Sequence, residues 1–143
     1  MNLVEVRDSP VGWVARHTRE YVATDGKKGH KWSGVRCLVL TTTGRRSGYK
    51  RRTTLIYGSD GDDFVVVGSN GGKKNNPQWY HNLVADSNVY VQVGAERFDA
   101  TARVAFGNER ARLWRMMTKI WPEYDKNQRK VERELPVVVL ERA

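Results

Sequence analysis

The chain has 143 residues and carries 25 Lys and Arg against 16 Asp and Glu, a formal net charge of +9. At this length we expect one domain over residues 1–143, in which residues 1–25 form an N-terminal helix and arm. A single cysteine excludes an internal disulfide, and no apolar run reaches the roughly 18 residues of a membrane-spanning helix. These features argue against a disulfide-stabilised secreted domain and predict a cytoplasmic protein.

The excess positive charge lies in one segment. Residues 26–59 contain nine Lys and Arg and no Asp or Glu, and the basic residues outside this segment equal the acidic ones in number. We therefore expect one face of the protein to attract a polyanion. A solvated basic face that only favours solubility is the alternative.

The first half of the sequence predicts one helix and three strands. Apolar residues recur at helical spacing between Pro10 and Ala23. Runs of strand-forming residues follow at Val35–Thr41, Arg51–Tyr57 and Phe64–Gly68. The Asp60-Gly61 pair is typical of a hairpin turn, which predicts that the second and third strands are antiparallel neighbours.

The second half predicts further helices and strands. Asn76 before Pro77 indicates the N-cap of a short helix, and Asn108 indicates the N-cap of a longer helix that stops before Pro122. The remaining predicted elements are the strands Val89–Val93, Phe98–Val104 and Pro136–Glu141 and a helical turn over Tyr124–Lys130. Six short strands with three to four helices predict an α+β, mainly β, antiparallel barrel.

Several kinds of catalytic site are absent from the sequence pattern. The three histidines, His17, His30 and His81, are far apart and share no metal-ligand spacing, so no metal site is predicted. Ser47 in "GRRSG" is followed by a strand and not by a helix, which argues against a hydrolase nucleophile.

Two glycine-rich loops favour an anion site. In "GRRSG" the glycines permit a tight turn, and Arg46 and the nearby Arg51 offer planar forks for phosphate or carboxylate oxygens. In "GSNGG" the backbone can expose several N–H groups to an anion. Both loops follow predicted strands, so they can border one groove if those strands pair.

An ordered series of motifs resembles a known family. The stretches are "TTTGRRSG", Arg51, "GSNGG", "NPQWYHNLVAD" and "WPEYDKNQ". Together they resemble the deazaflavin-dependent nitroreductases of actinobacteria, over the chain from about Val35 to the C-terminal strand. The resemblance implies an FMN-binding-like, six-stranded antiparallel split β-barrel. It also implies coenzyme F420, an 8-hydroxy-5-deazaflavin with a phosphodiester and an oligoglutamate tail; FMN is the less favoured cofactor.

The resemblance assigns cofactor contacts residue by residue. Arg45, Arg46, Ser47 and Arg51 match the phosphate and tail region, and Thr54 and Leu55 match the strand beside the deazaflavin. The second cofactor loop and the start of the following helix match Ser69, Asn70, Gly71, Gly72, Gln78, Trp79 and Asn82.

The substrate side departs from the best-known members of the family. They place a cluster of tyrosines above the cofactor, whereas this chain has Trp121, Tyr124 and Asn127. We expect Tyr124 to project toward the open side of the groove and, with Ser69, to be a candidate proton donor. The resemblance implies hydride transfer to electron-poor acceptors, namely activated enones and unsaturated lactones, quinones and nitro compounds. Enones are predicted to react faster than bicyclic nitroimidazoles.

Other functions stay open at this point. One is an FMN-using reductase of the same barrel, and another is a cofactor carrier without turnover. A third is a single-stranded nucleic-acid-binding module, because Trp32 and Tyr49 lie among the cations; we expect no nucleic-acid partner. The sequence does not decide the physiological acceptor, the oligomeric state, or whether the N-terminal helix is a lid or a peripheral contact with the inner membrane face.

Overall fold

The computed structural model describes residues 5–143 as a mainly β protein with four α-helices. The helices are α1 Gly12–Ala23, α2 Gln78–Ala85, α3 Gly107–Ile120 and α4 Glu123–Arg129, and η1 Asn70–Gly72 is a 3-10 turn. The strands are β1 Val6–Asp8, β2 Lys31–Trp32, β3 Val35–Thr43, β4 Lys50–Ile56, β5 Gly58–Asp60, β6 Asp63–Val67, β7 Asn88–Val93, β8 Glu96–Val104 and β9 Val137–Arg142.

The strands form one hydrogen-bonded sheet. Its order is β1-β4-β3-β7-β8-β9-β6-β5, and β2 pairs with β3. All pairs are antiparallel except β1 with β4. The described strands therefore number nine, not the predicted six, and β1, β2 and β5 are the short additions. The ladder is an open path, because β4 contacts β6 without pairing with it. The mainly β fold with helices is confirmed, but a closed six-stranded barrel is not.

The predicted pairing of the second and third strands is wrong. The hairpin over Asp60-Gly61 does form, but its first strand is β5, a separate strand of three residues. The chain changes direction at Tyr57, which is 4% exposed in the core. Gly58 then passes beneath α3, where a Cβ atom would lie 2.8 Å from the Met117 sulfur. β5 is thus a separate strand that packs against α3.

Both predicted asparagine caps are also wrong. Pro77 is the N-cap of α2, and Phe106 is the N-cap of α3, without a side-chain capping bond in either case. The Asn76 side chain instead accepts a hydrogen bond from Arg133. At Asn76 a long-range partner therefore replaces the predicted local cap.

The core has two main clusters on opposite faces of β6 and β9. On one face, Val66, Val138 and Leu140 pack with residues of β3, β7 and β8 and with Leu83 of α2. On the other face, Val65, Val67, Val137 and Val139 pack against α3 and α4. Because both faces are covered, these strands read as continuous runs of valine and leucine.

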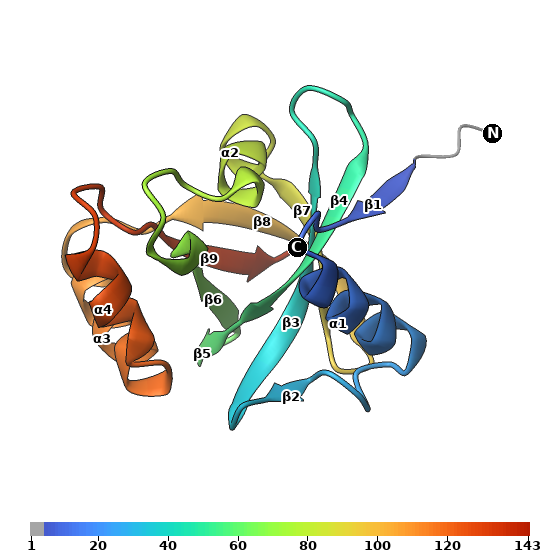
Figure 1. Cartoon of the computed structure of the whole chain (residues 1–143), viewed down its shortest axis with the longest axis horizontal. Helices are drawn as coiled ribbons and strands as arrows, with labels where there is room; N and C mark the ends of the chain where they lie inside the picture. Colours follow the sequence, from blue (N-terminus) through green and yellow to red (C-terminus); the bar gives the residue numbers. More distant parts are fainter. Residues whose placement is uncertain (1–4) are drawn as a thin grey trace.

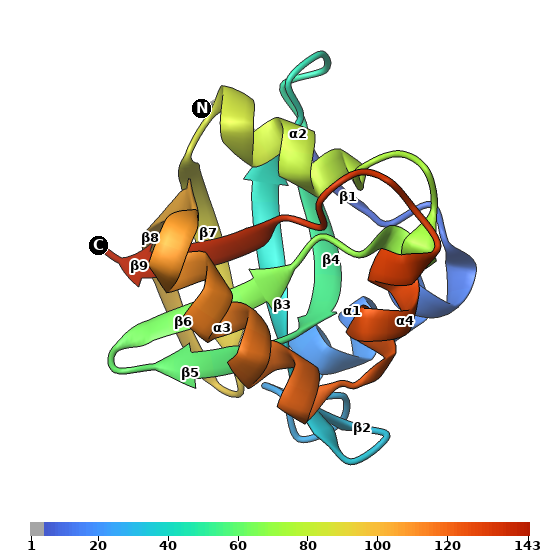
Figure 2. The same cartoon turned by 90° about the vertical axis from the view of Figure 1, so that its left-hand side faces the viewer.

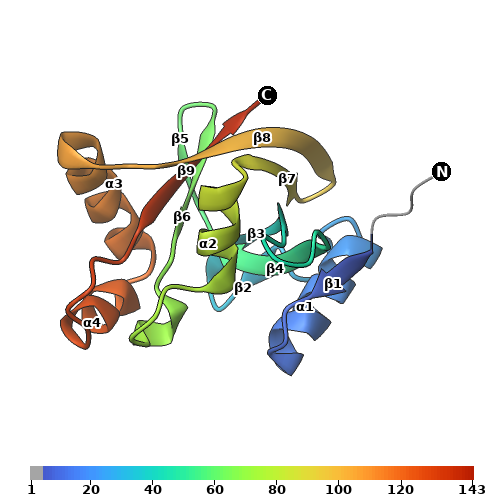
Figure 3. The ribbon, with the colours of Figure 1, turned by 90° about the horizontal axis from the view of Figure 1, so that it is seen from above.

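The four α-helices lie against different parts of the sheet. Figure 3 shows α3 and α4 at one end and α1 with β1 at the other, with α2 between them. Figure 2 shows α3 lying across the β5–β6 hairpin. The β3–β4 hairpin extends beyond the sheet beside α2 and β1 (Figure 1).

Candidate functional site

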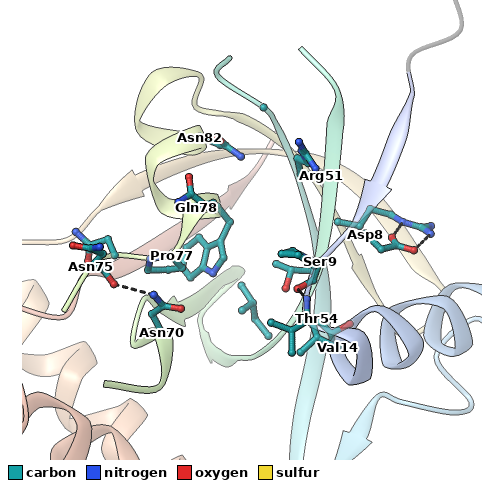
Figure 4. A pocket seen from close by; sticks show the side chains of 18 of the residues that line it. Asp8, Ser9, Val14, Arg51, Thr54, Asn70, Asn75, Pro77, Gln78 and Asn82 are labelled. Atoms are coloured by element: carbon teal, nitrogen blue, oxygen red, sulfur yellow. Dashed lines mark hydrogen bonds and ion pairs between the residues drawn. The ribbon is translucent and has the colours of Figure 1, made fainter. Parts of the chain in front are cut away.

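A cavity of about 870 Å³ lies between β4, α1 and α2. It is bordered by the β3–β4 turn, the middle of β4, the segment from Val67 to Pro77, the start of α2, and residues 8–14. Figure 4 shows Arg51 and Thr54 of β4 facing Gln78 and Asn82 of α2 across this space. The volume is within the usual range for small-molecule and cofactor sites.

The β3–β4 turn is closed by its own backbone. Gly44 N–H donates to the Tyr49 carbonyl at 2.7 Å, and Gly48 N–H donates to the Gly44 carbonyl at 2.9 Å. Gly48 has φ +75°, which favours glycine, and a Cβ on Gly44 would lie 2.6 Å from the Ser47 hydroxyl. The tight turn leaves Arg45, Arg46 and Ser47 exposed at the cavity rim.

Two of the four lining arginines are engaged within the protein. Arg52 forms a bidentate ion pair with Asp8, with Nε 2.7 Å from one carboxylate oxygen. Arg45 donates from Nη1 to Asn82 at 2.9 Å and from Nη2 to Gln78 at 2.8 Å. These contacts fix the N-terminal arm to β4 and the β3–β4 turn to α2.

The other two lining arginines lack such partners. Neither Arg46 nor Arg51 forms a side-chain hydrogen bond or an ion pair within residues 5–143; Arg51 lies 6.0 Å from the centre of the Tyr49 ring. Asp8 is the only carboxylate that lines the cavity in the described chain, and it is paired with Arg52. The site is therefore strongly cationic and can accept several anionic oxygens.

Asn82 ties three elements together. The side chain is 4% exposed, and its Oδ1 accepts from the Arg45 backbone N–H as well as from the Arg45 guanidinium. Its Nδ2 donates to the Thr42 hydroxyl at 3.3 Å. Asn82 thereby fixes the mouth of the cavity, although it was predicted as a direct cofactor contact.

The α1 wall is attached to β4 by a buried hydroxyl pair. Thr18 of α1 is fully buried, and its Oγ1 lies 2.7 Å from Oγ1 of Thr54. Beyond this contact, Trp13 and Val14 of α1 border the cavity. The Thr54 side chain is thus held by the helix, while Thr54 itself lines the cavity.

The structure brings most of the predicted cofactor residues together. Twelve of the thirteen line the cavity: Arg45, Arg46, Ser47, Arg51, Thr54, Leu55, Ser69, Asn70, Gly71, Gln78, Trp79 and Asn82. Gly72 is the exception. It lies against α4, where an added Cβ would be 3.1 Å from Asn127 Oδ1.

The predicted substrate residues do not line the cavity. Tyr124 is 5% exposed and packs in the core beneath α3, so the prediction that it projects toward the open groove is wrong. Burial raises the pKa of its hydroxyl well above the ordinary value of a tyrosine. Asn127 is also buried, and Trp121 packs against Trp32, with ring centres 5.5 Å apart. The short helix α4 turns Tyr124 and Asn127 inward, while Trp121, at the end of α3, packs against Trp32, so none of the three lines the cavity.

The N-terminal arm also borders the cavity, which the sequence did not predict. Asp8, Ser9, Val11 and Trp13 line the cavity, and so does Lys73 of the second loop. Lys73 could have been found from the run "GGKKNN". The arm residues gave no local signal, because their position depends on the pairing of β1 with β4.

The described residues contain neither a metal-binding cluster nor a membrane-spanning helix. Within residues 5–143, no group of three or more His, Cys, Asp or Glu could hold a metal ion. None of the helices in this part of the chain is long and apolar enough to cross a membrane.

The sheet carries a cationic cavity whose size and charge suit an anionic small molecule. Comparison with known proteins identifies the class further: residues 13–142 match the family model described as F420H(2)-dependent quinone reductase. The match spans nearly the whole chain, so the protein belongs to this family. It is an oxidoreductase that uses coenzyme F420.

Individual relatives agree with the family match. An F420H(2)-dependent quinone reductase of Mycobacterium tuberculosis H37Rv is 38% identical over 130 residues, covering 88% of this chain and 87% of that protein. A solved F420-H2 dependent reductase, FDR-A, superposes with a TM-score of 0.69 at 36% identity, covering 73% of this chain and 93% of that one. A domain-swapped dimer superposes with a TM-score of 0.72 at 33% identity, covering 93% and 100%.

The residues present fit such a cofactor. The cavity is long enough to be bordered by both glycine-rich loops, and Arg46 and Arg51 have no internal acidic partner among the described residues. A phosphodiester and a carboxylate tail are the anionic groups that arginine forks bind well. Trp79 and Leu55 add apolar surface for a planar ring system.

Proposed function

We propose that this protein reduces quinones and activated enones with reduced F420, and nitro compounds more slowly. The observation that carries this proposal is the cationic cavity lined by both glycine-rich loops. We also propose that the fold is the split β-barrel that the resemblance implies. In support, β4 contacts β6, although the two strands do not pair.

The residues of the chain bind and orient, and the bound cofactor supplies the redox chemistry. Arg46 and Arg51 would hold the anionic tail, while Leu55 and Trp79 would enclose the ring system. When bound, reduced F420 would supply the hydride that, together with a proton, converts a quinone into a hydroquinone. Ser69, which lines the cavity, is the hydroxyl proposed to donate a hydrogen bond or proton to the acceptor.

The alternative functions find less support in this geometry. FMN carries one phosphate, whereas three basic side chains that line the cavity have no partner within residues 5–143: Arg46, Arg51 and Lys73. A nucleic-acid-binding module would need Trp32 and Tyr49 to stack on bases, but both rings already contact other side chains of the protein. Trp32 packs between Trp13 and Trp121, and the Arg7 guanidinium lies 4.5 Å from the centre of the Tyr49 ring.

Titration of the purified protein with F420 and with FMN tests the cofactor. Stopped-flow or steady-state assays with reduced F420 and a menadione-type quinone, a cyclic enone or a bicyclic nitroimidazole then test the acceptor. We expect saturable F420 binding, weaker FMN binding, and turnover with the quinone and the enone that exceeds turnover with the nitroimidazole. Binding of F420 without turnover of any acceptor would instead indicate a carrier.

A further inference from the structure

Arg133, between α4 and β9, binds the second glycine-rich loop through its whole guanidinium group. Nε donates to the Lys73 carbonyl at 3.0 Å, and Nη2 donates to the Ser69 carbonyl at 2.8 Å. Nη1 donates to the Gly68 carbonyl at 3.1 Å and to Asn76 Oδ1 at 2.6 Å. Four of the five N–H groups of this side chain are thus used on one loop.

All four acceptors are neutral oxygens. Within residues 5–143 Arg133 forms no ion pair with a carboxylate. Burial lowers the pKa of the guanidinium, but an arginine stays protonated in proteins. A positive charge that no acid neutralises therefore lies directly behind the loop.

The loop backbone has the shape of an anion-binding concavity. The backbone of Ser69 has the right-handed helical conformation, with φ −71° and ψ −35°, and the backbone of Asn70 has the left-handed conformation, with φ +49°. A right-handed residue followed by a left-handed one aims successive N–H groups to the same side. The backbone N–H groups of Ser69, Asn70 and Gly71 donate no hydrogen bond to another group in the described chain, and these three residues line the cavity.

The contacts of Arg133 determine where those N–H groups point. In a trans peptide unit the carbonyl and the following N–H point in opposite directions. Arg133 holds the carbonyls of Gly68 and Ser69, so the N–H groups of Ser69 and Asn70 point away from it. Because Arg133 does not line the cavity, the opposite side of these peptide units is the cavity side.

We propose that Arg133 is the positioning residue of an anion subsite formed by the backbone N–H groups of Ser69 and Asn70. Its guanidinium orients these groups and adds a positive field behind them. The identity of the anion, the phosphodiester or another anionic group of F420, rests on the function proposed above. The orientation of the loop does not depend on that function and can be tested without ligand.

The first measurement is amide exchange in the ligand-free protein. The reporters are the N–H groups of Gly72 and Lys73, which donate to the Ser69 and Asn70 carbonyls at 2.9 and 3.1 Å. We expect Arg133→Lys and Arg133→Ala each to speed exchange of both amides at least ~10-fold, because lysine lacks the planar fork. Added guanidinium ion should restore protection in Arg133→Ala. Arg112→Met is the matched control, since it removes a bidentate guanidinium that pairs with Asp60 away from the cavity.

The second measurement is calorimetric titration with F420. Arg133→Ala should raise Kd at least ~10-fold and Arg133→Lys by less, since lysine keeps the charge, whereas Arg112→Met should leave Kd unchanged. If Arg133→Ala does not fold, Asn76→Ala, which removes one of the four bonds, should give the same changes at smaller size.

The outcomes separate the two proposals. Unchanged exchange at Gly72 and Lys73 overturns the role of Arg133. Faster exchange with unchanged F420 affinity, or equal effects in Arg112→Met, shows a structural brace only and also overturns it. If the parent protein does not bind F420, the proposed function fails, while titration with inorganic pyrophosphate and the exchange measurements still decide whether Arg133 orients an anion subsite.

Discussion

Arginines that are adjacent in the sequence have different partners in this protein. Arg45 and Arg52 each bind side chains of the protein, Asn82 with Gln78 and Asp8 respectively. Arg46 and Arg51 have no such partner among residues 5–143. A ligand anion can therefore be bound by Arg46 and Arg51 without breaking a contact that supports the fold.

Charge reversal tests this division directly. Arg46→Glu and Arg51→Glu should each weaken F420 binding by at least ~10-fold, because the loss of one charge-assisted contact costs about 1.5 to 3 kcal/mol and the new carboxylate repels the tail. The melting temperature should change little. Isothermal titration calorimetry measures the affinity, with Arg115→Glu as a control because Arg115 is an exposed residue of α3 outside the cavity. Equal losses in the control would indicate a general effect of net charge.

Tyr124 and Ser69 were both candidate proton donors, and the structure separates them. Tyr124→Phe should keep kcat within about twofold, since the Tyr124 ring is buried outside the cavity and its hydroxyl makes no hydrogen bond within residues 5–143. Ser69→Ala should reduce kcat at least ~10-fold with little change in F420 affinity, because a positioned donor contributes roughly 2 to 4 kcal/mol. Steady-state kinetics with a quinone and an enone measure both. A large loss in Tyr124→Phe alone would reverse the assignment.

At the scale of elements, the N-terminal arm is joined to the cavity by a short parallel pair. β1 aligns Val6 with Lys50 and Asp8 with Arg52. The Asp8–Arg52 side chains are only 15% and 24% exposed, whereas the Glu5–Arg7 pair of the same arm is about half exposed on both sides. The partly buried bidentate pair should therefore hold the arm, and the exposed pair should contribute little.

A charge swap separates this ion pair from general arm stability. Asp8→Asn should speed amide exchange of the β1 residues at least ~10-fold, because Arg52 loses its partner in a partly buried place. Exchanging the two residues, Asp8→Arg with Arg52→Asp, should recover most of the protection. Glu5→Gln is the control and should change exchange by less than about twofold. Failure of the double variant to recover would show that the arm is held by the strand pairing and not by the ion pair.

The long elements were predictable because their pattern is local. β3, β4, β7, β8 and β9 appear in the alternation or apolar runs of the sequence, and all four helices were found from periodicity and proline positions. β1 and β5 are three residues long and exist only through their partners. A strand of that length has no periodicity to detect.

The candidate site was predictable where motifs carry it and not where packing decides. The resemblance located the two glycine-rich loops, which need glycine and arginine at fixed positions. It could not show which face of the seven-residue helix α4 is buried, so Tyr124 was misplaced. The bonds of Arg133 were equally hidden, because three of its acceptors are backbone carbonyls that any sequence provides.

At the scale of the whole molecule, two buried groups between α1 and β3 make stability depend on pH. Burial raises the pKa of the Cys37 thiol from 9.0 to about 12. Burial also raises the pKa of Tyr21 from 10.0 to about 12, although a hydrogen bond from the Gly94 N–H opposes this shift. Both groups are neutral when protonated, so the folded protein keeps these protons to higher pH than the unfolded chain. Their contribution is complete below pH 9 and is lost as the pH rises toward 12.

Urea unfolding at pH 8.5 and 10.5 checks this dependence. We expect the free energy of unfolding to fall between these values, because the unfolded chain releases protons that the folded protein retains. Cys37→Ala removes one of the two groups, so it should be less stable than the parent at pH 8.5 but lose less stability on going to pH 10.5. Lysine and other exposed groups titrate equally in both proteins and cancel in this comparison. An identical loss in the parent and in Cys37→Ala would show that the thiol ionises as easily in the folded protein as in the unfolded chain, which contradicts its burial against Tyr21 and Val39.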